Sequence, residues 1–128
     1  MGILDRLKSS QAEKLEHNWN TLNSIDQLDA LEKESFEKPV VIFKHSISCG
    51  LSAMARYQLE RDWDFGGEEL SFYYLDLINN RSVSNEVADR YSVIHQSPQI
   101  IVLKDRKALY NTSHHKISVP DLRQGLSH

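Results

Sequence analysis

The sequence has few of the features that build disulfides, membrane spans or nucleic-acid surfaces. It contains one cysteine in 128 residues, which excludes an internal disulfide, so the expected location is a reducing cytoplasm. No apolar run approaches the ~20 residues that cross a bilayer, so we expect no membrane contact. The net charge is only −3 and the Lys and Arg residues are scattered, which argues against a nucleic-acid partner.

The length of 128 residues indicates one domain. The first 19 residues have neither a long apolar core nor a small-residue cleavage site, so we expect no secretory signal there. We predict that residues 1–17 form a partly helical N-terminal arm of marginal order, and that residues 18–128 form a single domain.

The most informative stretch runs from Pro39 to Leu59. It opens with four consecutive apolar residues, VVIF, a pattern typical of a strand that is buried on both faces. After a small polar turn comes Cys49, and apolar residues then recur at helical spacing up to Leu59. Cys49 is therefore predicted where a buried strand ends and a helix begins. The free N–H groups there stabilise a thiolate and make the sulfur a nucleophile.

The rest of the chain alternates between the periods of strands and helices. The predicted order is a weak strand at 19–22, a helix at 25–35 with a Ser24–Gln27 capping box, the strand at 40–43, the Cys49 helix, a strand at 70–77, a helix at 83–90 capped by Ser82 or Ser84, a strand at 99–103, a hairpin strand at 108–112, and a helix from 118. The alternating first half requires parallel pairing with right-handed crossovers. The fold class is therefore α/β, a thioredoxin-like fold with a central mixed sheet and helices on both faces.

Cys49 and Ser52 occupy the place where such a fold carries Cys-x-x-Cys. Serine cannot resolve a mixed disulfide, although its hydroxyl is placed to donate a hydrogen bond to the thiolate. The pattern predicts monothiol exchange, in which one sulfur takes over a small thiol and a second small thiol releases it. An inert, buried cysteine is the alternative. The helix start and the nearby Lys44 and His45 favour a reactive thiol.

Two further features concern the surroundings of Cys49. Ser97 and Pro98 precede an apolar strand, where thioredoxin-like domains have a cis-proline against the reactive sulfur; an ordinary trans proline is the alternative. The histidines do not predict a metal site, because the chain has no second cysteine and no His-x-x-x-His pair. His45 and His95 are instead candidates for raising the thiolate fraction, or ordinary solvated loop residues.

These residues resemble the monothiol bacilliredoxins, thioredoxin-like general-stress proteins of bacteria that make bacillithiol. The resemblance runs from about residue 24 to 126 and rests on KPVVIFKHS at 38–46, SC-x-x-S at 48–52, NR-x-x-SNE-x-A at 80–88, H-x-SPQ at 95–99 and SH-x-x-I at 113–117. It implies that Cys49 is the nucleophile, and that the substrate-binding residues are Ser52, Ser97, Pro98, Lys44, His45 and His114. It also implies S-thiolated client proteins and a small thiol as partners, with no bound cofactor.

One residue departs from this family, which usually has Thr-Cys-Pro-Ile-Ser where this chain has Gly50 after the cysteine. Cys-Gly-Leu-Ser is also similar to the Cys-Gly-Phe-Ser of monothiol glutaredoxins, which bind a [2Fe–2S] cluster between two subunits. The chain lacks their glycine-rich glutathione-binding segment. An iron–sulfur carrier is thus the second hypothesis, and a non-catalytic thioredoxin-like binding module is the third.

Overall fold

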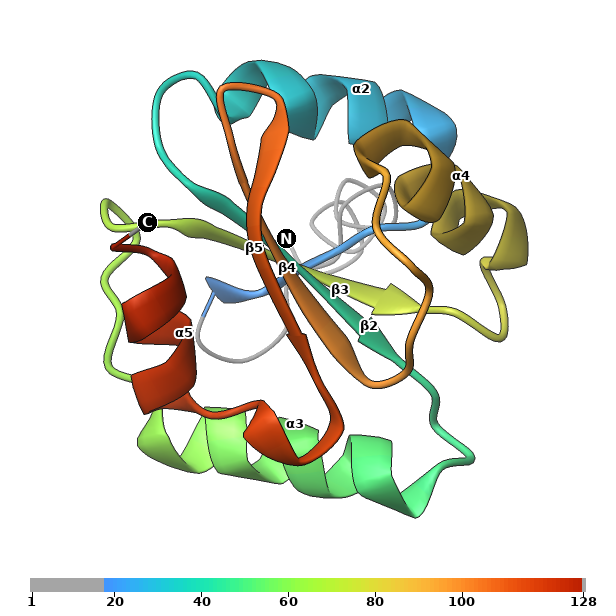
Figure 1. The fold of residues 1–128 in the computed structure, drawn as a ribbon, viewed down its shortest axis with the longest axis vertical. Helices are drawn as coiled ribbons and strands as arrows, with labels where there is room; N and C mark the ends of the chain where they lie inside the picture. Colours follow the sequence, from blue (N-terminus) through green and yellow to red (C-terminus); the bar gives the residue numbers. More distant parts are fainter. Residues whose placement is uncertain (1–17, 128) are drawn as a thin grey trace, which may run out of the picture.

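The computed structural model describes residues 18–127, so the predicted arm at 1–17 lies outside the described residues. Five strands and four α-helices follow one another along this part of the chain (Figure 1). In order they are β1 (Asn20–Thr21), α2 (Ile25–Glu34), β2 (Val40–His45), α3 (Gly50–Asp62), β3 (Ser71–Asp76), α4 (Arg81–Tyr91), β4 (Gln99–Lys104), β5 (Lys107–Ser113), the short 3₁₀ helix η2 (His114–Lys116) and α5 (Val119–Gly125).

The strands form one mixed sheet in the order β1-β3-β2-β4-β5. β1, β3 and β2 are parallel, whereas β4 pairs antiparallel with both β2 and β5. The helical crossovers between the first three strands require the parallel pairing, and the tight connection between β4 and β5 requires the antiparallel one. The predicted mixed sheet is confirmed.

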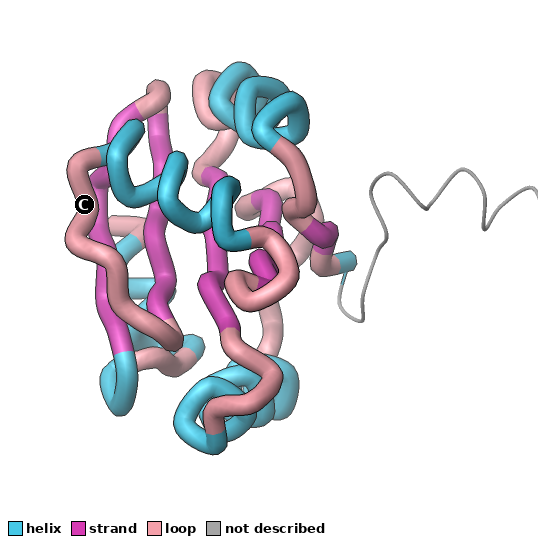
Figure 2. The backbone as a smooth tube through the Cα atoms, turned by 90° about the vertical axis from the view of Figure 1, so that its right-hand side faces the viewer, coloured by secondary structure: helices cyan, strands magenta, loops and turns pink. Residues whose placement is uncertain are grey.

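β2 is the middle strand of the sheet. All six of its side chains are buried, which only a central strand covered on both faces can provide. Its alternate residues feed two separate hydrophobic layers. Val41 and Phe43 pack with α3 and α5 on one face, and Val40 and Ile42 pack with α2 and α4 on the other. Figure 2 shows the strands between the helices at the top and the bottom of the view. Helices therefore cover both faces, as predicted.

The start of α2 follows the predicted capping chemistry, α5 is capped in the same way, and α4 is not. Ser24 and Ser118 each accept a hydrogen bond from the backbone N–H three residues later. α4 instead begins at Arg81, with Asn80 as its N-cap, so the expectation that Ser82 or Ser84 caps it is wrong. The Ser84 side chain is buried on the face of α4 that packs against the sheet.

The two ends of β5 are set by backbone geometry. Asp105 and Arg106 both have positive φ, 51° and 66°, as a tight two-residue hairpin turn requires. At the other end, residues 114–116 form η2 rather than the predicted loop.

Among residues 18–127 no helix combines the length and apolarity needed to cross a membrane.

Gly125 in α5 provides a test of the packing between α5 and β5. A Cβ on Gly125 would lie well inside van der Waals contact with the ring of Tyr110. We expect Gly125→Ala to lower the free energy of unfolding by about 1–3 kcal/mol because the buried contact becomes overpacked. Gly67→Ala is the matched control, since nothing lies within 4 Å of its added Cβ. Urea denaturation of both variants makes the measurement, and equal stabilities would contradict this packing.

Candidate functional site

The directions of three strands bring the site residues together at one edge of the sheet, where β2 and β3 end and β4 begins. β2 and β3 run parallel, so both end at this edge, and antiparallel β4 begins there, with Gln99 opposite Lys44. The turn that carries Cys49 follows β2, and Pro98 directly precedes β4. Two segments 49 positions apart in the sequence are thereby brought to the same edge of the fold.

Cys49 is the N-cap residue of α3, as predicted, and its side chain is partly exposed. The backbone N–H groups of Ser52 and Leu51 lower the pKa of the thiol, with a smaller contribution from the Ser52 hydroxyl, although the Cys49 side chain makes no capping hydrogen bond. Desolvation opposes them. A partly exposed sulfur at the start of a helix, with its pKa lowered by the first-turn amides, has the properties of a nucleophilic thiolate.

Ser52 connects the cysteine to the preceding turn. Its side chain is completely buried, and its oxygen accepts a hydrogen bond of 3.3 Å from the backbone N–H of Ser46. The hydroxyls of Ser46 and Ser48 are in turn 3.2 Å apart. Ser52 therefore holds the shape of the 46–49 turn in addition to donating to the thiolate.

The Ser97–Pro98 peptide bond is cis, in agreement with the prediction from sequence. The Pro98 carbonyl accepts a hydrogen bond of 3.1 Å from the backbone N–H of His114. The His114 side chain lies with Leu51 and Met54 around a small cavity beside α3. This places His114 and Pro98 next to each other at the end of the sheet near the first turns of α3. The Ser97 hydroxyl oxygen is buried and has no hydrogen-bond partner in the described structure.

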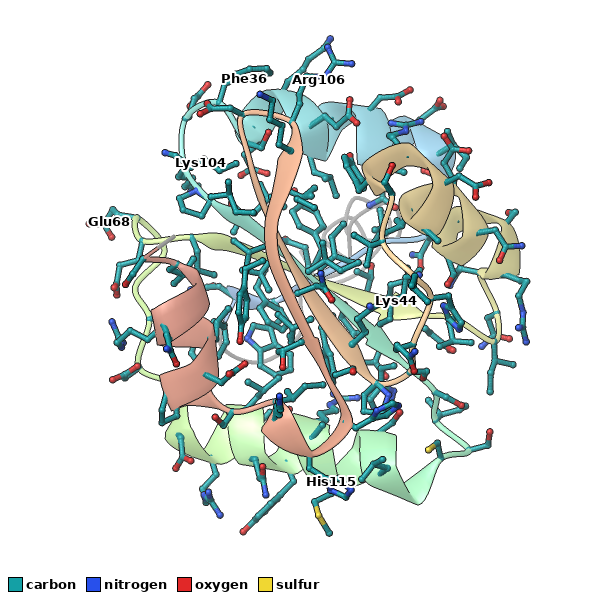
Figure 3. The ribbon with its side chains drawn as sticks, viewed as in Figure 1. Phe36, Lys44, Glu68, Lys104, Arg106 and His115 are labelled. Carbon is teal, nitrogen blue, oxygen red and sulfur yellow. The ribbon has the colours of Figure 1, made fainter. Side chains whose placement is uncertain are left out.

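Lys44 and His45 point to opposite faces of the sheet because they are neighbours on a strand. The Lys44 ammonium donates to the carbonyl of Ser84, at 3.0 Å, and lies 3.2 Å from Nδ1 of His95 (Figure 3). Burial lowers the pKa of Lys44 to about 8. The side chain has no exposed surface, so Lys44 does not offer its charge directly to a ligand.

His45 is part of a buried cluster that the sequence pattern did not reveal. Its Nδ1 lies 2.7 Å from the hydroxyl of Tyr74, and the guanidinium of Arg56 sits 4.9 Å from the centre of the Tyr74 ring. Burial, followed by the charge of Arg56, lowers the pKa of His45 to about 4. Burial also lowers the pKa of His95. Both imidazoles are therefore neutral near pH 7, and neither supplies the positive charge that was expected to favour the thiolate.

The residues that the structure describes contain no group of three or more His, Cys, Asp or Glu side chains able to hold a metal ion. His114 and His115 are neighbours in η2, and both contribute to the cavity beside α3.

Comparison with known families decides the relationship of the chain. The family model for monothiol bacilliredoxin BrxC matches residues 20–122, which include every element from β1 to the first half of α5. The chain belongs to the monothiol bacilliredoxin family. The resemblance inferred from the sequence motifs is thus confirmed, and the family supports a thiol redox role for this bacilliredoxin.

Solved structures agree on the fold. A candidate oxidoreductase with a thioredoxin fold is 32% identical, with a TM-score of 0.70, and the match covers 84% of this chain and 92% of that one. Thioredoxin f from spinach chloroplasts is 20% identical over 85% of this chain and 90% of its own, with a TM-score of 0.64. The thioredoxin of Malassezia sympodialis is 21% identical over 84% and 86%, with a TM-score of 0.63. The predicted thioredoxin-like fold is confirmed.

The reactivity of Cys49 in this bacilliredoxin can be measured as the rate of alkylation against pH. We expect a midpoint below the ordinary cysteine value of about 8.5. Ser52→Ala should raise the midpoint, because the thiolate loses one donor, but leave it below the ordinary value, because both amides remain. Ser82→Ala, on the exposed surface of α4, is the matched control and should leave the midpoint unchanged. A wild-type midpoint at or above the ordinary value would contradict this description of the site.

Gly50 separates this chain from the usual family motif, and the structure predicts that proline is tolerated there. Gly50 is the first residue of α3, where proline fits, and the preceding Cys49 is extended, with φ −108° and ψ 120°. Its N–H is not one of the donors to the sulfur. We expect Gly50→Pro to raise the free energy of unfolding by about 0.4–1 kcal/mol with an unchanged thiol pKa. Denaturant titration and alkylation test both parts, and a raised thiol pKa would show that the Gly50 amide takes part.

Proposed function

We propose that this protein is a monothiol thiol–disulfide oxidoreductase that removes bacillithiol, or a similar low-molecular-weight thiol, from S-thiolated proteins. The observation that carries the proposal is the position of Cys49, a partly exposed N-cap residue whose thiol pKa is lowered by the first-turn amides of α3. Membership of the monothiol bacilliredoxin family supports it. The partners are client proteins that carry the modification, and free small thiol.

The first step is a thiol–disulfide exchange. The Cys49 thiolate attacks the sulfur that the small thiol contributes to the mixed disulfide of the client. A new S–S bond forms between Cys49 and the small thiol, the old S–S bond breaks, and the client cysteine leaves as a thiolate that takes a proton from water. The first-turn amides that lower the pKa of Cys49 raise the fraction of the attacking sulfur that is deprotonated near neutral pH.

The second step needs another thiol, because the chain contains no second cysteine. Ser52 stands where a resolving thiol would, and its hydroxyl is a far poorer nucleophile than a thiolate. A second molecule of small thiol attacks the Cys49 adduct, releases the Cys49 thiolate and leaves as the symmetrical disulfide. The reaction requires no bound cofactor. A cycle that depends on reduced small thiols fits a reducing cytoplasm, and repair of S-thiolated proteins fits a role in the stress response.

Intact-mass spectrometry tests the proposal directly. The protein is incubated with a bacillithiolated client, and both masses are followed. We expect the client to lose the mass of one bacillithiol while Cys49 gains it, and the adduct to persist until free bacillithiol is added. Cys49→Ser should abolish the transfer. Ser52→Ala should still form the adduct, because the amides that lower the thiol pKa remain. It should form the adduct more slowly, because the contribution of the Ser52 hydroxyl is lost.

Two results would contradict the proposal. If the client keeps its modification while the protein reconstituted with iron and sulfide binds a cluster as a dimer, the iron–sulfur carrier is the better description. If neither transfer nor cluster binding occurs and Cys49 alkylates no faster than free cysteine, the protein is a non-catalytic binding module of the thioredoxin fold.

A further inference from the structure

Two polar residues end the apolar rows of β2 and β4 at the edge of the sheet that carries the thiol site. Lys44 follows Val40 and Ile42 on one face of β2, and Gln99, its partner in β4, lies directly opposite on the same face. Both side chains are buried, since Lys44 has no exposed surface and Gln99 is 1% exposed. Buried polar groups are costly unless they are hydrogen-bonded, so the partners of these two residues show what they do.

The partners of both side chains lie on the segment that connects α4 to β4. The Gln99 side-chain nitrogen donates to the carbonyl of Ile94 at 3.0 Å, and its oxygen accepts from the backbone N–H of Gln96 at 3.4 Å. The Lys44 ammonium lies 3.2 Å from Nδ1 of His95 and donates to a carbonyl of α4 at 3.0 Å. Figure 3 shows Lys44 between the strands and this segment. Two side chains therefore tie three successive residues of the segment to the sheet.

The segment has little else to hold it. Within the described part of the chain, residues 94–97 make no hydrogen bonds other than those to Lys44 and Gln99. The Ile94 side chain is 81% exposed, so it does not pack the segment into the core. Between the buried residues Val93 and Pro98, the position of the chain thus depends on the two polar side chains of the sheet.

The segment leads directly into the thiol site. It ends in the cis Ser97–Pro98 bond, and the carbonyl of the proline accepts a hydrogen bond of 3.1 Å from the backbone N–H of His114. His114 and Leu51 line the same cavity beside α3, and Leu51 lies in the first turn of that helix, which begins at Cys49. Successive contacts therefore join the two buried side chains to the part of α3 that lowers the thiol pKa.

We propose that Lys44 and Gln99 are positioning residues for disulfide exchange at Cys49, because they hold the segment that places Pro98 beside the thiol site. This inference rests on the proposed function, in which the attacked disulfide has to lie in line with the Cys49 sulfur. Neither residue touches the disulfide, and both act through residues 94–98. Alkylation by a small reagent needs only the thiolate, whereas exchange also needs the disulfide to be aligned against Pro98.

The test compares two reactions of the full chain, exchange with 2-hydroxyethyl disulfide and alkylation by iodoacetamide, both followed by intact mass. Lys44→Met keeps an unbranched side chain of similar length, and apolar replacements of buried charges are often neutral or stabilising. We therefore expect an unchanged or higher unfolding midpoint and unchanged alkylation. Exchange should be about tenfold slower, since a misplacement of about 1 Å can cost on the order of a hundredfold. Gln99→Met should act in the same direction.

Leu31→Ala is the matched control. It truncates a buried side chain in the same hydrophobic layer, but on α2, which makes no hydrogen bond to residues 94–98 in the described structure. It should lower the unfolding midpoint and leave the ratio of exchange to alkylation unchanged. A merely structural role for Lys44 and Gln99 predicts the reverse, a loss of stability with an unchanged ratio.

The imidazole Cε1–H signal of His95, assigned by its loss in His95→Gln, gives a spectroscopic reading of the contact with Lys44. Burial lowers the pKa of His95, and the charges of Lys44 and Arg81 lower it further. An NMR titration of Lys44→Met should therefore show a higher pKa for His95 than the wild type has. An unchanged value would overturn the contact on which the inference depends.

The inference is also overturned if Lys44→Met and Gln99→Met keep the wild-type ratio of exchange to alkylation, or if Leu31→Ala lowers that ratio as much as they do. A wild-type protein that alkylates but exchanges with no disulfide would overturn the inference and the proposed function together. Failure of the proposed function alone looks different. A bacillithiolated client would then keep its modification, while exchange with 2-hydroxyethyl disulfide still slows in both variants.

Discussion

Burial of β2 on both faces is the constraint on which the rest of the structure depends. A strand whose side chains are all buried has to lie in the middle of a sheet with helices on both sides. The residues that follow such a strand emerge at an edge of the sheet, and here they form the short turn that ends at Cys49. The same strand thus builds the core and delivers the sulfur to the start of α3.

The thiolate is stabilised by backbone groups rather than by a neighbouring cationic side chain. The amides of Leu51 and Ser52 are held rigidly by the helix, so their stabilisation of the thiolate costs little reorganisation. The charged side chains at this edge are directed elsewhere: Lys44 and Arg56 each contact a residue of the core. The lowered pKa of the thiol therefore depends on the backbone of α3 rather than on these charged side chains.

The sequence predicted the fold well because its strongest signals are local. The dense apolar run of β2, the cap at Ser24 and the proline in α5 each act within a few residues, and their elements were found in the predicted order. The start of α4 was misplaced because Ser84 has the chemistry of a cap but is used as a buried residue. Its role depends on the distant sheet, which local preference does not describe.

For the site, the sequence predicted Cys49 at the N-terminus of α3 and the cis bond at Pro98. It did not predict the partners of the charged residues. The sequence analysis placed Lys44 and His45 together beside Cys49, whereas β2 continues through both residues and its alternation turns them to opposite faces. Their contacts with His95 and Tyr74 join positions 51 and 29 residues apart, and these depend on how the strands and loops assemble. The low pKa of His45 follows from that burial and was not visible in the sequence.

The opposite directions of Lys44 and His45 also limit how β2 can pair with its neighbours. If the strand slipped by one residue, every side chain would change faces, and Lys44 would enter the aromatic layer around Phe72 and Tyr74. The ammonium would then lose the carbonyl and imidazole that hold it, at a cost typical of an unpaired buried charge. A lysine at this position thus makes the wrong alignment far less stable than the right one, so it helps the chain to fold to a single arrangement of its central strand.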